Sequence, residues 1–187
     1  QSAARTWSIQ VGEALDAEVG IVAFCSQGYG VGVDTYNLPE FYNTSDQTWD
    51  ELFSGQPRSF IGIDAIMITH GTNDIEASDE SVESNVVDFL SDFRSANAGI
   101  TIHLVVPFGG IKRTAITGAF YAYQAATPDA NCYLIDITEA DTTLAEDLDG
   151  DASYTTYSYD GLHPNQAGHD LIGALVTEAI SALGISQ

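Results

Sequence analysis

The chain has 187 residues, of which 44% are hydrophobic, so it is long enough for one domain with a substantial core. It carries 27 acidic and only 5 basic residues, for a formal net charge of −22. Binding to nucleic acid needs clustered lysine and arginine, so this charge excludes it and also disfavours anionic membranes and acidic substrates. No apolar run is long enough for a membrane span. The acidity either keeps the protein soluble or fits a saline environment in which salt screens the self-repulsion.

Apolar runs and helical patterns alternate along the chain. Helices are expected over Ala3–Ala17, Ser81–Ala96, Thr114–Ala126 and Asn165–Leu183, with Ser78 or Asp79 at the start of the second. Strands are expected over Ile21–Cys25, Ile63–Thr69, Thr101–Pro107 and Cys132–Ile137. The strand runs are almost continuously hydrophobic, which is typical of a parallel sheet covered on both faces. The alternation predicts a single three-layer α/β/α domain over residues 1–187, with right-handed crossovers.

The segment Tyr159–Asn165 contains an Asp-x-x-His pair, Asp160 and His163, directly before the last helix. Pro164 is suited to the first turn of that helix. A carboxylate that orients an imidazole is the base needed to deprotonate a hydroxyl in acyl transfer. The alternative is that Asp160 caps a turn and His163 is an ordinary surface residue.

A second motif, Gly71-Thr72-Asn73-Asp74, follows the apolar run that ends at Thr69-His70. Ligands of parallel α/β sheets bind where strands reach their carboxyl ends. There Asn73 could donate its side-chain amide to a developing oxyanion. The alternative is an ordinary turn and helix cap.

These two motifs, with the strand and glycine turn of Ile21–Gly30, resemble the SGNH/GDSL hydrolase superfamily and are most similar to its carbohydrate acetyl esterases. The resemblance implies a flavodoxin-like three-layer fold with a mostly parallel sheet. It assigns His163 as the catalytic base and Asp160 as its orienting acid. It implies Asn73 and Gly28 as oxyanion donors, with Gly30 or Gly32 as alternatives to Gly28.

The chain departs from the family pattern because it contains no Gly-Asp-Ser, the nucleophile block at the end of the first strand. Ser2 and Ser26 are disfavoured as nucleophiles, because neither lies in a Gly-Asp-Ser block. We therefore expect an N-terminally truncated domain without its first strand, or a diverged relative that lost its serine. The resulting gap in the sheet would be closed by the upstream segment, by a second copy in a homodimer paired through strand edges, or by the flanking strands.

The resemblance also predicts which residues line a substrate pocket. Tyr29, His70 and Phe108 are the expected substrate-binding residues. The aromatic segment Tyr29–Phe60 would lie over the site, where its rings could stack on a sugar or pack on one another. The adjacent bases Lys112 and Arg113 are expected to pair with nearby acids rather than with a substrate carboxylate.

No cofactor and no metal ligands are predicted. Asp147–Asp151 resembles part of a calcium loop but lacks its spaced ligands, so a solvated acidic loop is the preferred interpretation. His70 and His103 are expected in the core or at its rim, and His169 beside the site. The two cysteines, Cys25 and Cys132, are expected to be buried thiols rather than a disulfide.

The sequence thus predicts a secreted serine ester hydrolase that removes acyl groups, acetyl above all, from a carbohydrate or small ester by a Ser-His-Asp mechanism. No signal peptide is visible in the chain. One alternative is a catalytically inactive SGNH-fold protein that binds a ligand or assembles with itself. Another is a lipase or thioesterase of the same superfamily, which would need a long apolar cleft.

Overall fold

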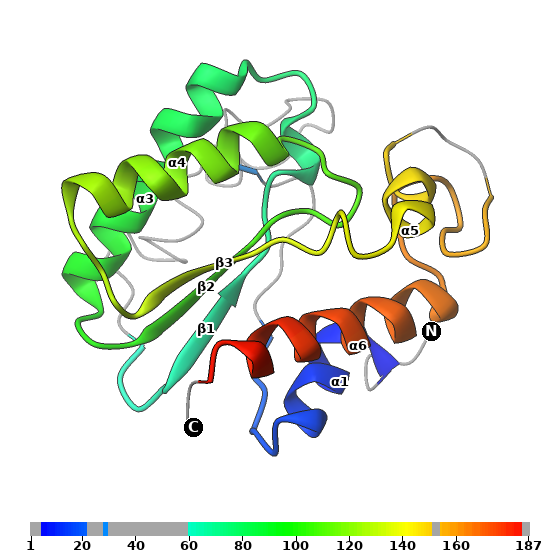
Figure 1. Ribbon diagram of the computed structural model, residues 1–187, viewed down its shortest axis with the longest axis horizontal. Helices are drawn as coiled ribbons and strands as arrows, with labels where there is room; N and C mark the ends of the chain where they lie inside the picture. Colours follow the sequence, from blue (N-terminus) through cyan, green and yellow to red (C-terminus); the bar gives the residue numbers. More distant parts are fainter. Residues whose placement is uncertain (1–4, 22–27, 30–59, 151–153, 185–187) are drawn as a thin grey trace, which may run out of the picture. The chain divides into compact units, whose positions relative to one another are not determined.

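The computed structural model describes residues 5–21, 28–29, 60–150 and 154–184 (Figure 1). The chain divides into two compact units, each of which is described by itself. The sheet unit comprises residues 24–107 and 111–134, and the helical unit comprises residues 1–23, 108–110 and 135–187.

The sheet has the strand order β1-β2-β3, with bounds β1 (Ala65–Ile68), β2 (Thr101–Val105) and β3 (Cys132–Ile135). β1 and β2 run parallel, with Ala65 opposite Thr101 and Ile68 opposite Leu104. These strands confirm three of the predicted runs, and each is shorter than its run. The fourth predicted run, Ile21–Cys25, and the predicted repair of the sheet gap fall largely outside the described residues, so that repair and the homodimer stay predictions.

Helices α3 (Asp79–Ala96) and α4 (Arg113–Ala126) pack against each other and follow β1 and β2 in the chain (Figure 1). Ser78 caps α3 by accepting a hydrogen bond from the Ser81 amide at 3.2 Å, as the sequence predicts. The core of the unit joins apolar side chains of the strands to the inner faces of both helices. Its fully buried members include Ile68, Ile102, Leu104, Val86, Leu90, Ile116 and Ala119.

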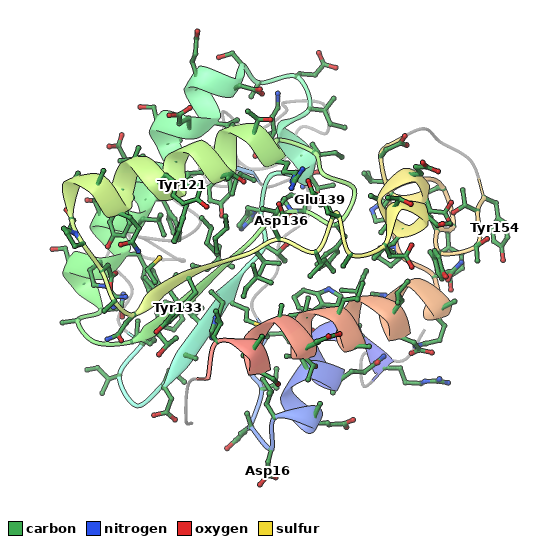
Figure 2. The ribbon with its side chains drawn as sticks, in the orientation of Figure 1. Asp16, Tyr121, Tyr133, Asp136, Glu139 and Tyr154 are labelled. Carbon is green, nitrogen blue, oxygen red and sulfur yellow. The ribbon has the colours of Figure 1, made fainter. Side chains whose placement is uncertain are left out.

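The helical unit contains α1 (Trp7–Ala14), α5 (Thr142–Asp147) and α6 (Gln166–Ala182), and α1 packs on α6. α1 ends earlier than predicted because Asp16, which is labelled in Figure 2, adopts a left-handed backbone. Its φ is 55°. α5 was not predicted, and Asp141 caps it by accepting a hydrogen bond from the Leu144 amide at 2.9 Å.

α6 begins at Gln166, one residue later than predicted. Asn165 is its cap and accepts a hydrogen bond from the Gly168 amide at 3.1 Å. The placement of Pro164 in the first helical turn was therefore wrong. Pro164 precedes the cap and forms an isolated antiparallel bridge with Ser158. None of the helices in the described ranges is both long and apolar enough to cross a membrane.

Candidate active site

Asp160 and His163 form a hydrogen-bonded pair within the helical unit. Asp160 Oδ2 lies 2.7 Å from His163 Nδ1, and Asp160 Oδ1 accepts the backbone amides of His163 at 2.8 Å and Leu162 at 3.0 Å. Gly161, with φ of 79°, supplies the left-handed turn between them. One carboxylate oxygen thus folds the loop while the other orients the imidazole, and Nε2 is left for proton transfer.

These hydrogen bonds also set the charge of Asp160. The backbone amide of His163, then its imidazole, lower the pKa of Asp160 to about 2. The carboxylate therefore stays ionised at any pH at which an ester hydrolase works. An ionised acceptor beside Nδ1 selects the imidazole tautomer with its proton on Nδ1, which is the form of a general base acting through Nε2.

The predicted oxyanion residues lie together in the sheet unit. After β1, Gly71 turns the chain with φ of 117° into the short 3₁₀ helix η3 (Thr72–Asp74), which carries half-buried Asn73. The next residue, Asp74, is buried and accepts the Tyr29 amide at 2.8 Å. Gly28 packs so closely on the Asp74 carboxylate that a Cβ atom there would collide with it. Asp74 therefore joins the Gly28 turn to the block that contains Asn73.

The residues predicted to bind substrate have different environments. Tyr29 is 1% exposed, and its ring packs in the core with centroids 5.5 Å from His70 and 5.9 Å from Phe89. A ring with so little exposed surface belongs to the core. His70 is half-buried beside it. Phe108, in the helical unit, is half-buried and meets Trp7 edge to face at 5.2 Å.

Other predicted features have structural explanations. Lys112 Nζ donates to the Ala77 carbonyl at 2.6 Å and pairs with Asp79 at 3.0 Å, which confirms the expected salt bridge. Cys132 is a buried free thiol, and burial raises its pKa to about 12. Cys25 lies outside the described residues, as does nearly all of the aromatic segment 29–60.

The remaining histidines and acids do not form a metal site in the described ranges, where no three His, Cys, Asp or Glu side chains gather as ligands. His103 is buried on β2, and burial lowers its pKa. His169 Nδ1 accepts the Trp7 amide at 3.4 Å. Asp147, part of the calcium-like run, ends α5 and accepts the Tyr157 amide at 2.9 Å.

The structure therefore brings Asp160 to His163 in one unit and Gly28 to the Asn73 block in the other. Ser2 and Ser26 lie outside the described residues. Asp74 was not identified from the sequence as the link to Gly28. The only signal was its place directly after Asn73 in the Gly-Thr-Asn-Asp motif. Ser158 was also missed, because no motif marks it.

Residues 2–171 match the GDSL-like Lipase/Acylhydrolase family. The chain belongs to this family. No curated protein matches the chain. Several solved structures share the fold of this GDSL-like chain, and the alignments cover 97–98% of it.

One is a family two carbohydrate esterase from Clostridium thermocellum in complex with cellohexaose, 17% identical, with a TM-score of 0.70 over 98% of this chain and 55% of that one. Another is an acetyl xylan esterase from the rumen bacterium Butyrivibrio proteoclasticus, which is 16% identical. Its TM-score is 0.68, and the alignment covers 98% of this chain and 57% of that one. A third is a family 2 carbohydrate esterase with a carbohydrate binding domain from Corynascus thermopiles (Myceliophthora fergusii), 20% identical, with a TM-score of 0.59 over 97% and 57%. The GDSL-like chain spans about half the length of these structures, and their likeness confirms the predicted SGNH-type α/β fold.

Proposed function

We propose that this chain is part of a serine carboxylic ester hydrolase that removes acyl groups, acetyl above all, from a carbohydrate. The observation that carries the proposal is the Asp160–His163 pair, in which an ionised carboxylate lies 2.7 Å from Nδ1 of an exposed imidazole. Membership of the acylhydrolase family supports the ester chemistry. The carbohydrate esterases of similar fold, one of them bound to cellohexaose, support the sugar. A polymeric sugar substrate would place the enzyme outside the cell.

In the proposed mechanism a serine hydroxyl attacks the ester carbonyl while His163 Nε2 takes the hydroxyl proton. Asp160 holds the imidazole in its Nδ1–H tautomer and stabilises the imidazolium that forms. The Asn73 side-chain amide and the Gly28 N–H donate hydrogen bonds to the oxyanion. His163 then gives its proton to the departing alcohol, and water releases the acyl group. The mechanism requires Asp160–His163 and the Gly28–Asn73 donors to converge on one ester.

The strong acidity of the chain supports a neutral substrate, since a net charge of −22 repels anionic esters. The competing function is a ligand-binding protein that keeps the fold without an activated nucleophile. The choice between these two functions depends on whether a serine of the protein is activated.

The test is labelling with a fluorophosphonate, which reacts with activated serines, followed by mass-spectrometric mapping of the labelled peptide. In the protein extended to include the Gly-Asp-Ser segment, we expect one labelled serine, loss of the label in His163→Ala, and a fall in kcat of about 10⁴-fold in Asp160→Asn. Thr177→Val, which removes a hydroxyl from α6 away from the pair, should label like the wild type. Labelling that survives His163→Ala would refute the proposed base.

A panel of esters separates the alternatives. Acetylated xylo-oligosaccharide should be cleaved with a higher kcat/KM than a long-chain p-nitrophenyl ester. The reverse order would indicate a lipase or thioesterase. Absence of both label and hydrolysis, with retained binding to the sugar, would indicate the binding protein.

A further inference from the structure

Ser158 is a fully buried side chain in contact with both members of the Asp160–His163 pair. Its exposed fraction is 0%. Ser158 Oγ donates to the His163 carbonyl at 3.1 Å and accepts the Asp160 amide at 3.2 Å. Its own amide donates to Thr155 Oγ1 at 3.0 Å. One hydroxyl thus satisfies a backbone group on each of the two residues.

The same hydroxyl closes the loop 159–163. Ser158 and Pro164 form an antiparallel bridge across its base, and the Tyr159 amide donates to the His163 carbonyl at 3.0 Å. That carbonyl therefore accepts two hydrogen bonds, one of them from Ser158. Inside the loop, Asp160 Oδ1 accepts the amide of His163. These hydrogen bonds fix the backbone amide of Asp160 and both the amide and the carbonyl of His163.

Packing contributes little to the orientation of the pair. The side chains of His163 and Asp160 are 71% and 50% exposed. Their geometry must come from the backbone that carries them, and hydrogen bonds rather than buried contacts hold that backbone. Ser158, which is fully buried, ties this exposed loop to buried structure at the residues of the pair themselves.

We propose that Ser158 is a positioning residue, which sets the Asp160–His163 geometry through these two backbone hydrogen bonds. The importance of Ser158 for catalysis rests on the proposed function. Its effect on the geometry of Asp160 and His163 does not. Without the hydroxyl, the Asp160 amide and one acceptor site of the His163 carbonyl lose their partner. The loop can then widen, and Oδ2 can leave Nδ1.

The rest of the loop's attachment does not depend on Ser158 Oγ. The backbone N–H of Asn165 donates to the Tyr157 carbonyl at 2.9 Å, and its side-chain Nδ2 donates to the Thr156 carbonyl at 2.9 Å. Gly168 lets the first turn of α6 approach Tyr157 so closely that a Cβ atom would collide with its carbonyl. These contacts hold the segment on α6, so we expect Ser158→Ala to fold.

The test is NMR of Ser158→Ala, with Thr177→Val as the matched control. Thr177 Oγ1 donates to the Gly173 carbonyl at 2.7 Å within α6 and touches neither residue of the pair. Two signals are followed: the ¹⁵N shifts of the His163 ring, which report its tautomer, and the ¹³C shift of the Asp160 carboxyl as a function of pH.

Wild type and Thr177→Val should show the Nδ1–H tautomer and an Asp160 pKa of about 2. Ser158→Ala should show a mixture of tautomers and an Asp160 pKa that rises toward about 3.9. Ser158→Cys, which keeps a weak donor of similar size, should lie between them. Unchanged tautomer and pKa in folded Ser158→Ala would overturn the proposal. Were neither variant to fold, rapid exchange of the wild-type Asp160 amide would overturn it and protection of that amide would support it.

These signals need no substrate, so they separate this assignment from the proposed function. In an active protein, Ser158→Ala should lower kcat about 10- to 100-fold with little change in KM. A protein that hydrolyses no ester but shows the NMR changes would refute the proposed function and keep the positioning role. Full activity in Ser158→Ala with an altered tautomer would refute the role of the pair in catalysis.

Discussion

Asp74 has the same kind of role in the sheet unit that Ser158 has in the helical unit. Its buried carboxylate accepts the Tyr29 amide and packs on Gly28, so a contact distant in sequence places the predicted oxyanion glycine. This contact explains why position 28 is glycine: the space of a side chain is filled by the carboxylate.

Gly28→Ala should therefore destabilise the protein, because its methyl group must displace the Asp74 carboxylate. We expect a loss of about 1–3 kcal/mol in the free energy of unfolding, measured by urea denaturation. Gly99→Ala is a poor control because Gly99 has a positive φ, whereas Gly20 has no positive φ and no described residue within 4 Å of a Cβ atom placed there. Gly20→Ala should be near neutral, and an equally small effect at Gly28 would contradict the described packing.

The sequence was informative for residues whose partners are local. Asp160 and His163 interact across one turn, so their spacing allowed the contact, and the resemblance to the hydrolase superfamily favoured it over an ordinary turn. Asp74 and Ser158 could not be predicted, because their roles depend on backbone groups placed by the fold. Tyr29 lies in a polar, aromatic stretch, and only the packing of Phe89 and His70 around it shows a buried ring.

At the scale of elements, β2 contains a buried histidine between apolar neighbours. His103 is 3% exposed, its ring stacks on Tyr133 at 5.9 Å, and its Nδ1 has no hydrogen-bond partner among the described residues. Figure 2 shows Tyr133 on the neighbouring strand β3. Burial lowers the pKa of His103, so the folded state favours the neutral ring.

The pH dependence of stability follows from that direction. His103 binds a proton near about pH 6.5 in the unfolded chain but not in the folded protein. The contribution of neutral His103 to the free energy of unfolding is therefore fully present above about pH 6.5 and is lost as the pH decreases below it. His103→Phe should flatten this slope in denaturant titrations. His169, whose pKa burial also lowers, adds a slope of the same sign, so His169→Phe should flatten the dependence near about pH 6.5 further. An unchanged slope in the double variant would contradict this explanation.

Most helices and strands could be predicted because hydrophobic periodicity reports burial directly. Their ends were harder, since they depend on single backbone conformations such as the positive φ of Asp16. α5 was missed because its acidic residues are typical of a solvated loop, whereas the Asp141 cap and buried Leu144 make it a helix.

For the whole molecule, charge is the dominant property. With 27 acidic and 5 basic residues, the folded chain repels itself, and salt should relieve that repulsion. The screening length falls from about 10 Å at 0.1 M to about 3 Å at 1 M salt. We expect Tm to rise steadily with NaCl over this range. Sorbitol at equal osmolarity controls for solvent exclusion, and a Tm that responds equally to both would contradict the electrostatic explanation.

The fold class follows from the alternation of elements and is confirmed by the solved structures of similar fold. The mutual placement of the proposed catalytic pair and the oxyanion donors could not be predicted from the sequence in this way. It depends on how segments far apart in the chain are arranged, and no local pattern of residues encodes that.

Lys112 gives the scarcity of basic residues a practical consequence. It is the one lysine in the sequence, and its amine is held by the Ala77 carbonyl and Asp79 at the start of α4. An amine-reactive reagent therefore meets a single side-chain target, which becomes available when those two contacts break. The acylation rate of Lys112 therefore reports how often its contacts with Ala77 and Asp79 open. Intact-mass spectrometry can follow this rate without any change to the sequence.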